Sequence, residues 1–241
     1  PFVVCAARHG CRDALKPYRP ARSVVSRWNR LLMPRSGLDR VVGVNQFNVC
    51  VVPGSPALVA ELAPGDFVGR AMVRTVRELA EKDARAVHIV GSRDGRWRTE
   101  RTGSLAAWGA RNVAVGGGNY LAELVARYCL GTGAERVTDS RATLAPFDPE
   151  ALTVVVVDGS AGLTRRAPLA LVDGAQETHE HMARFLAGDD ALPDELAVRG
   201  VVEPALWHEL AALRPVRCEL LAHDASLGVG RFVAAWQVDH A

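Results

Sequence analysis

The residues best suited to chemistry in this chain lie in a short polar turn, Asp158-Gly159-Ser160, which follows the apolar run 154–157. An Asp carboxylate and a Ser hydroxyl can bind a hydroxylated ligand, and the Asp can also exchange a proton with it. The four consecutive valines predict a strand buried on both faces, as in a parallel sheet covered by helices. Ligands of open α/β sheets bind at the carboxyl ends of the strands. The turn therefore predicts where the site lies, with Asp158 and Ser160 as candidate catalytic residues.

The seven histidines and five cysteines form no metal-binding motif of known spacing, because the chain contains neither H-x-x-x-H nor C-x-x-C. His223, which precedes Asp224, is the third candidate catalytic residue. His179 and His181 are two residues apart in a predicted helix, so they point about 200° apart and cannot share one metal ion. An odd number of cysteines without a paired motif is typical of a reducing compartment, so we predict a cytoplasmic protein.

Two glycine-containing loops follow predicted strands and are candidates for backbone contacts with a ligand. One is Pro-Gly-Ser-Pro at 53–56, and the other is the run of three glycines at 116–118, which precedes a predicted helix. Free N–H groups at a helix start can bind an anion, but the spacing matches no phosphate-binding fingerprint, so we favour a tight turn for the second loop. The predicted ligand-binding residues are Gly54, Ser55, Gly117, Gly118, Asp158, Gly159 and Ser160.

Predicted strands alternate with predicted helices along most of the chain. Apolar residues recur at helical spacing in 66–82, 120–130, 175–187 and 204–213. Short runs rich in Val and Ile predict strands at 41–52, 86–90, 113–115, 135–138, 154–157 and 228–238. Such alternation with short connections is typical of an α/β protein with a mostly parallel sheet.

Charge divides the chain into two parts. Residues 1–40 carry eight Arg and one Lys against Asp13 and Asp39, whereas the whole chain has a net charge of only +2. This basic segment has no apolar periodicity, and we interpret it as a disordered or non-native extension; binding of nucleic acid through it is the alternative. Residues 41–241 form the predicted α/β domain. No apolar run is long enough to cross a membrane, so we expect no membrane partner.

Four segments, in this order, resemble the subunit-B-like family of class III extradiol ring-cleavage dioxygenases, and most closely its small alanine-rich actinobacterial members. They are VCVVPGSPALVAEL (49–62), RTGSLAAWGARNVAVGGG (101–118), VVVVDGSAGLTRRAP (154–168) and CELLAHDASLGVGRFVAAW (218–236). The last two are the more specific. The resemblance implies a three-layer α/β/α fold, and a homodimer is plausible because subunits of such proteins often pair.

Active members of that family hold a non-haem Fe(II) ion with two His and one carboxylate, and use a further His as acid and base. Residue by residue, this chain departs from that pattern. The position of the first ligand falls on Gly54 or Ser55, and that of the acid/base His on Ala161. The mid-chain stretch 91–118 holds no His for the second ligand. Glu219 is the candidate carboxylate.

We therefore expect a degenerate member of this fold, non-catalytic or repurposed, which needs no cofactor and binds a small-molecule ligand or a protein partner at the strand ends. The sequence leaves open whether the protein is an enzyme. The first alternative is an active oxidoreductase whose Fe(II) is held by a rearranged set of His88, Glu219 and His223. The second is nucleic-acid binding through residues 1–40.

Overall fold

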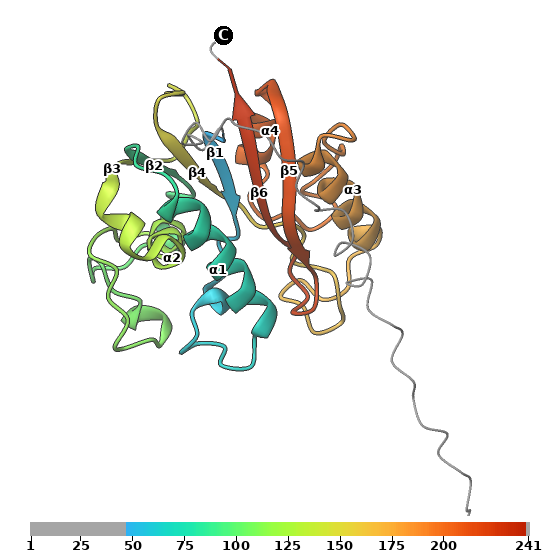
Figure 1. Cartoon of the computed structure of the whole chain (residues 1–241). Coiled ribbons are helices and arrows are strands. Elements are labelled where there is room, and N and C mark those ends of the chain that lie inside the picture. Colours follow the sequence, from blue (N-terminus) through green and yellow to red (C-terminus); the bar gives the residue numbers. More distant parts are fainter. Residues whose placement is uncertain (1–46, 240–241) are drawn as a thin grey trace, which may run out of the picture. The chain divides into compact units, whose positions relative to one another are not determined.

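The computed structural model describes residues 47–239. These residues contain a single six-stranded mixed sheet with helices packed on it (Figure 1). The strand order is β3-β2-β4-β1-β6-β5, in which β1 to β4 run parallel, β6 runs antiparallel to β1, and β5 runs antiparallel to β6. The strands are β1 (Val49–Val52), β2 (Val87–Val90), β3 (Val137–Arg141), β4 (Leu152–Val156), β5 (Pro215–Asp224) and β6 (Arg231–Val238).

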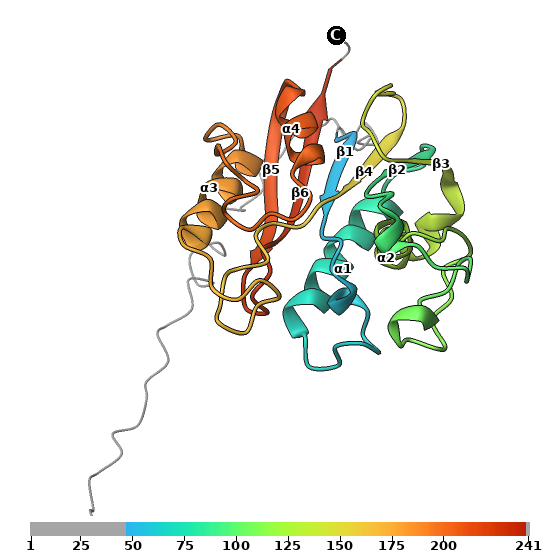
Figure 2. The same ribbon diagram turned by 180° about the vertical axis from the view of Figure 1, so that it is seen from behind.

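Helices cover both faces of this sheet, as the two opposite views show (Figures 1 and 2). The α-helices are α1 (Phe67–Glu81), α2 (Leu121–Leu130), α3 (Ala175–Ala187) and α4 (Ala205–Ala212). Alternate residues of β1 point to opposite sides: Cys50 and Val52 pack in the core under α1 and α2, whereas Val49 and Val51 pack in the core under α3 and α4. The predicted three-layer α/β fold with a mostly parallel sheet is confirmed.

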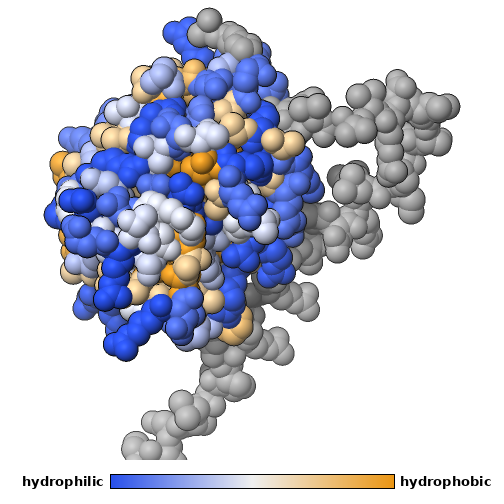
Figure 3. Space-filling model, turned by 90° about the vertical axis from the view of Figure 1, so that its left-hand side faces the viewer, coloured by the Kyte–Doolittle hydropathy of each residue, from blue (hydrophilic) through white to orange (hydrophobic). Residues whose placement is uncertain are grey.

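Short 3-10 helices lie in the connections, at η2 (Pro56–Leu58), η3 (Gly95–Trp97), η4 (Ala106–Trp108) and η5 (Gly131–Arg136). The side of the molecule that faces the viewer in Figure 3 carries mainly hydrophilic residues, with small apolar areas between them. Within the described residues, no helix is both long enough and apolar enough to cross a membrane.

The four predicted helices match the observed ones to within one residue at each end. The predicted strand 113–115 is wrong: Ala114 forms only a single antiparallel bridge to Ser104, outside the sheet. The strand predicted at 135–138 begins at Val137, and that predicted at 228–238 begins at Arg231. Strand β5 was not predicted at all. Residues 1–40, and 41–46 of the first predicted strand, lie outside the described residues.

The register of β1 and β4 places the two most relevant loops side by side. Val52 pairs with Val156 in the parallel ladder, and the N–H of Val157 donates to the carbonyl of Val52 at 3.0 Å. The chain therefore leaves both strands at the same edge of the sheet. The turn before β6 closes over this edge, where the N–H of Gly159 donates to the carbonyl of Gly230 at 2.7 Å.

Candidate active site

A cavity of about 570 Å³ lies at the carboxyl ends of β1, β2 and β4. Its walls are mainly apolar, and two indole rings, Trp97 and Trp108, line it. Polar side chains enter from four loops: Ser55 after β1, Arg93 after β2, Asp158 after β4 and Glu203 before α4. A mostly apolar cavity with a few convergent polar groups is the usual form of a small-molecule site.

Asp158 is the central polar residue of this cavity. Its Oδ1 accepts a hydrogen bond from the N–H of Gly54 at 3.0 Å, and its carbonyl accepts one from the indole N–H of Trp207 at 2.9 Å. Burial raises the pKa of the Asp158 carboxyl to about 6, although the backbone N–H groups of Gly54 and Ser55 favour the ionised form. A carboxyl with such a pKa can accept or donate a proton near neutral pH.

Gly54, Ser55 and Gly159, which were predicted to bind a ligand, line the same cavity. Ser55 caps the short helix η2, where its Oγ accepts from the N–H of Ala57 at 3.4 Å. Gly159 is pressed against the turn before β6, and a Cβ there would lie 2.8 Å from Phe232. The residue type at position 159 is therefore set by this close approach of two chain segments.

Ser160 has a different environment from Asp158, although both belong to one turn. It is fully buried, and its Oγ accepts from the N–H of Gly162 at 3.1 Å. It is not among the residues that line the cavity, and a Cβ on Gly200 would lie 2.7 Å from its hydroxyl. The structure thus places the Ser160 hydroxyl in a loop-stabilising position rather than at a ligand.

Gly117 and Gly118 also lie outside the lining of this cavity. A Cβ on Gly117 would lie 3.3 Å from the guanidinium carbon of Arg127, and one on Gly118 would lie 2.5 Å from the carboxyl carbon of Glu123. Gly118 also has a positive φ of +82°, which other residues rarely adopt. The glycine run is therefore a turn whose backbone packs against the ion pair of Glu123 and Arg127, in agreement with the tight turn that we favoured from the sequence.

His223 does not reach the cavity but pairs with a buried histidine. Its Nδ1 lies 3.4 Å from Nε2 of His179, whose ring stacks on Phe232 at 4.8 Å. Burial, followed by the charge of His223, lowers the pKa of His179. The neighbouring His181 points elsewhere and lies 2.7 Å from Asp190, which confirms that the two histidines of α3 do not face the same point.

The alternative metal set of His88, Glu219 and His223 does not converge. His88 lies on β2 and the other two on β5, four strand spacings away, which is roughly 19 Å at about 4.8 Å per spacing. A register shift in β5 pairs Glu219 with Ala235 but His223 with Phe232, so these two side chains point to opposite faces of the sheet. Residues 47–239 contain no group of three or more His, Cys, Asp or Glu side chains placed to hold a metal ion.

Sequence reasoning missed a charged cluster beside the cavity. Arg93 pairs with Oε2 of the buried Glu123 at 3.0 Å, lies over the ring of Tyr120 at 4.6 Å, and donates to Ser140. Its position directly after a strand, at the ligand-binding edge, is the signal that could have found it. Across the cavity, the indole N–H of Trp97 donates to a carboxylate oxygen of Glu203 at 2.7 Å, a pairing that no sequence spacing indicates.

Comparison with protein-family models and with curated protein sequences finds no match to this chain. The chemistry of the site therefore rests on its own residues. A mostly apolar cavity with the Asp158 carboxyl, one guanidinium and two indole rings, one of them held by Glu203, can bind a small planar molecule that carries a hydroxyl or carbonyl group.

Proposed function

We propose that this protein binds a small, largely apolar and planar ligand in the cavity at the ends of β1, β2 and β4. The observation that carries this proposal is the Asp158 carboxyl, which faces an apolar cavity of about 570 Å³ and has its pKa raised to about 6. A ligand hydroxyl would donate to this carboxylate, while the rings of Trp97 and Trp108 would contact the flat body of the ligand.

We further propose that the chain is a degenerate relative of the extradiol dioxygenases that uses this cavity without the iron chemistry of that family. The residues at the family's ligand positions do not fit a metal ion. The first ligand position falls on Gly54 or Ser55: Gly54 offers no donor, and the Ser55 hydroxyl, a poor ligand for Fe(II), caps η2 instead. A Cβ built on Gly54 would already lie 3.0 Å from Oδ2 of Asp158 and 3.3 Å from Val156. A His at this position would displace Asp158. Ala161, to which the resemblance assigns the position of the acid/base His, lines the cavity and has no titratable group.

Catechol is a suitable probe, because it is planar and carries two hydroxyl groups. We expect calorimetric titration at pH 7.5 to show binding of catechol to the wild-type protein and to Asp173→Asn, a control that removes an exposed carboxylate. Binding should weaken at least tenfold in Asp158→Asn, since a hydrogen bond to a charged group contributes about 1.5–3 kcal/mol. Equal affinities of Asp158→Asn and Asp173→Asn would contradict the proposed role of Asp158.

The enzyme alternative is tested with the same protein, purified without chelator. Metal analysis and oxygen consumption with catechol should give neither stoichiometric iron nor ring cleavage. Bound iron together with oxygen uptake would replace the binding proposal with the active dioxygenase, despite the separation of His88 from Glu219 and His223.

A further inference from the structure

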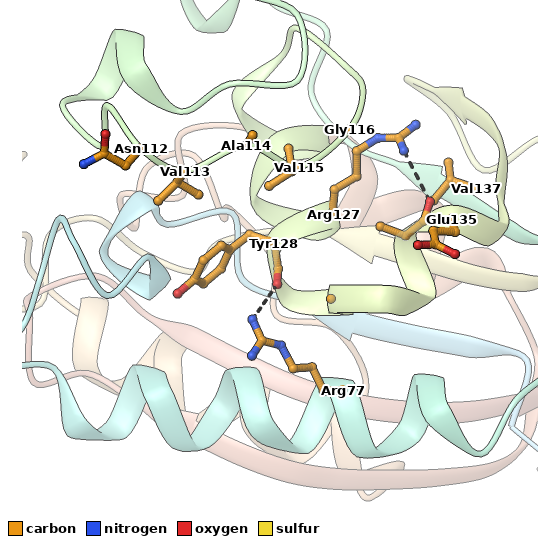
Figure 4. A pocket seen from close by; sticks show the side chains of 12 residues that line it. Arg77, Asn112, Val113, Ala114, Val115, Gly116, Arg127, Tyr128, Glu135 and Val137 are labelled. Carbon is orange, nitrogen blue, oxygen red and sulfur yellow. Dashed lines mark hydrogen bonds between the residues drawn. The ribbon is translucent and has the colours of Figure 1, made fainter.

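A second cavity, of about 670 Å³, lies away from the first one, beside the carboxyl end of α2 (Figure 4). The two cavities share no lining residue. This second cavity is bounded by α1, α2, η5 and the loop before the glycine run, and its lining is both polar and apolar. The lining residues used below are Arg77, Asn112, Val113, Val115, Arg127 and Val137.

Arg77 is the most informative side chain of this cavity. It extends from α1 toward α2, where one terminal nitrogen donates to the carbonyl of Tyr128 at 3.1 Å (Figure 4). Its guanidinium carbon lies 5.5 Å from the centre of the Tyr128 ring. No carboxylate of residues 47–239 lies within 4.0 Å of this guanidinium. Arg77 is thus a cation held in place by a carbonyl and a ring, without a counter-ion.

The Nε–H of Arg77 is also buried and has no hydrogen-bond partner in the described part of the chain. An unsatisfied buried donor of a charged group is costly, so such a group usually has an acceptor that the protein itself does not supply. Gly131 lies beside this atom, and a Cβ there would approach Nε to 3.2 Å. The glycine, at φ +59°, packs against this atom, so an acceptor would reach the Arg77 guanidinium from the cavity that Arg77 lines.

A second guanidinium, that of Arg127, lies on the same cavity (Figure 4). Its Nε and one terminal nitrogen each lie 3.1 Å from Oε1 of Glu123, but Glu123 also pairs with Arg93 at 3.0 Å. One buried carboxylate therefore serves two arginines. The lining itself contains two arginines, Arg77 and Arg127, and one exposed carboxylate, that of Glu135.

We propose that this cavity is a binding site for a small organic anion, whose phosphate or carboxylate group accepts from the guanidinium of Arg77. An oxyanion supplies the negative charge that Arg77 lacks, and hydrogen bonds between charged groups are the strong ones. The side chains of Val113, Val115 and Val137 form an apolar wall for the body of the ligand. The proposal uses none of the residues that line the catechol cavity proposed above.

Nitrogen-15 NMR of the arginine Nε–H groups tests this directly, with inorganic phosphate and phenyl phosphate as probes at constant ionic strength. The Arg77 signal is assigned by its absence in Arg77→Lys. We expect it to shift and saturate with both probes, at several-fold lower concentration for phenyl phosphate, and to remain unmoved by chloride. Acetate then shows whether a carboxylate suffices. An Arg77 signal that does not respond to any of the anions would overturn the proposal.

Matched variants complete the test. Arg77→Gln should weaken phenyl phosphate binding at least tenfold, whereas Arg74→Gln removes an exposed Arg one turn earlier in α1 and should leave it unchanged. Equal affinities of these two variants would show adventitious binding to positive charge only. Asn112→Asp, at an exposed position of the lining, adds a negative charge without touching the core and should weaken binding several-fold. An unchanged affinity in Asn112→Asp would count against the site.

Discussion

Replacement of Asp158 by Asn should change how the stability of the folded protein depends on pH. Asn keeps the shape of the side chain, and its carbonyl oxygen can still accept from the N–H of Gly54, but it does not titrate. The wild-type carboxyl, by contrast, has a pKa raised from 3.8 to about 6. The folded state therefore binds this proton more tightly than the unfolded state does.

The sign and size of the effect follow from this difference in pKa. The stabilisation by protonation is complete below the unfolded pKa of 3.8 and is lost as the pH rises through about 6. At about 1.36 kcal/mol per pKa unit, the total is about 3 kcal/mol. By proton linkage, the folded protein loses about 2 kcal/mol of this stabilisation between roughly pH 4.5 and pH 7.5. The free energy of unfolding of Asp158→Asn, measured relative to that of the wild type, should thus rise by about 2 kcal/mol from pH 4.5 to pH 7.5.

Urea denaturation at these two pH values measures the gain as a double difference in the free energy of unfolding. The control is Asp173→Asn, an exposed position for which we expect no change with pH. A difference between Asp158→Asn and wild type that stays constant from pH 4.5 to pH 7.5 would refute the reasoning. It would show that the carboxyl is as well solvated in the folded protein as in the unfolded chain.

Three further predictions concern the ligand and the buried charges. Catechol affinity of the wild-type protein, measured by calorimetry, should rise as the pH increases through about 6, because the ionised Asp158 is the better acceptor; a flat profile would contradict this. Glu123→Gln should lower the free energy of unfolding by about 3 kcal/mol in urea denaturation, since it leaves two arginines without their buried carboxylate, whereas removal of the exposed Glu135 should have little effect. Gly118→Ala should lower it by about 2 kcal/mol or more, because its Cβ would overlap Glu123 at a positive φ; a near-neutral result would show that the loop can shift.

The sequence predicted the elements whose signal is local. The helix at 66–82 has a complete apolar face and an N-capping Asp66, so its ends were readable to one residue. The central strand β4 is buried on both faces, and its run of valines shows this directly. Strand β5 lies at the edge of the sheet, with mixed exposure and polar residues throughout, so neither a buried run nor a clean alternation marks it.

The site was predicted at the correct edge of the sheet but only in part. Asp158 follows a central strand, and the rule for strand ends suffices to place it. Ser160, two residues later, is buried instead, because the contact between Gly159 and the turn before β6 redirects the chain, and that contact is made with a segment 70 residues away. Arg93 follows β2 and the same rule could have placed it, whereas Glu203 reaches the cavity from a loop before α4 that no local pattern marks.

The glycine run resembles a ligand-binding motif, but its glycines are required by packing against a buried charged side chain. Three consecutive glycines before a helix suggest free N–H groups directed at an anion. In the structure, the loop instead lies against Glu123 and Arg127: a Cβ on Gly118 would overlap Glu123, and one on Gly117 would be in tight contact with Arg127. Glu123 also pairs with Arg93, which lines the first cavity, while its other partner, Arg127, lines the second. One carboxylate therefore supports the glycine loop and both cavities. The two cavities are therefore joined by one electrostatic contact, although they share no lining residue.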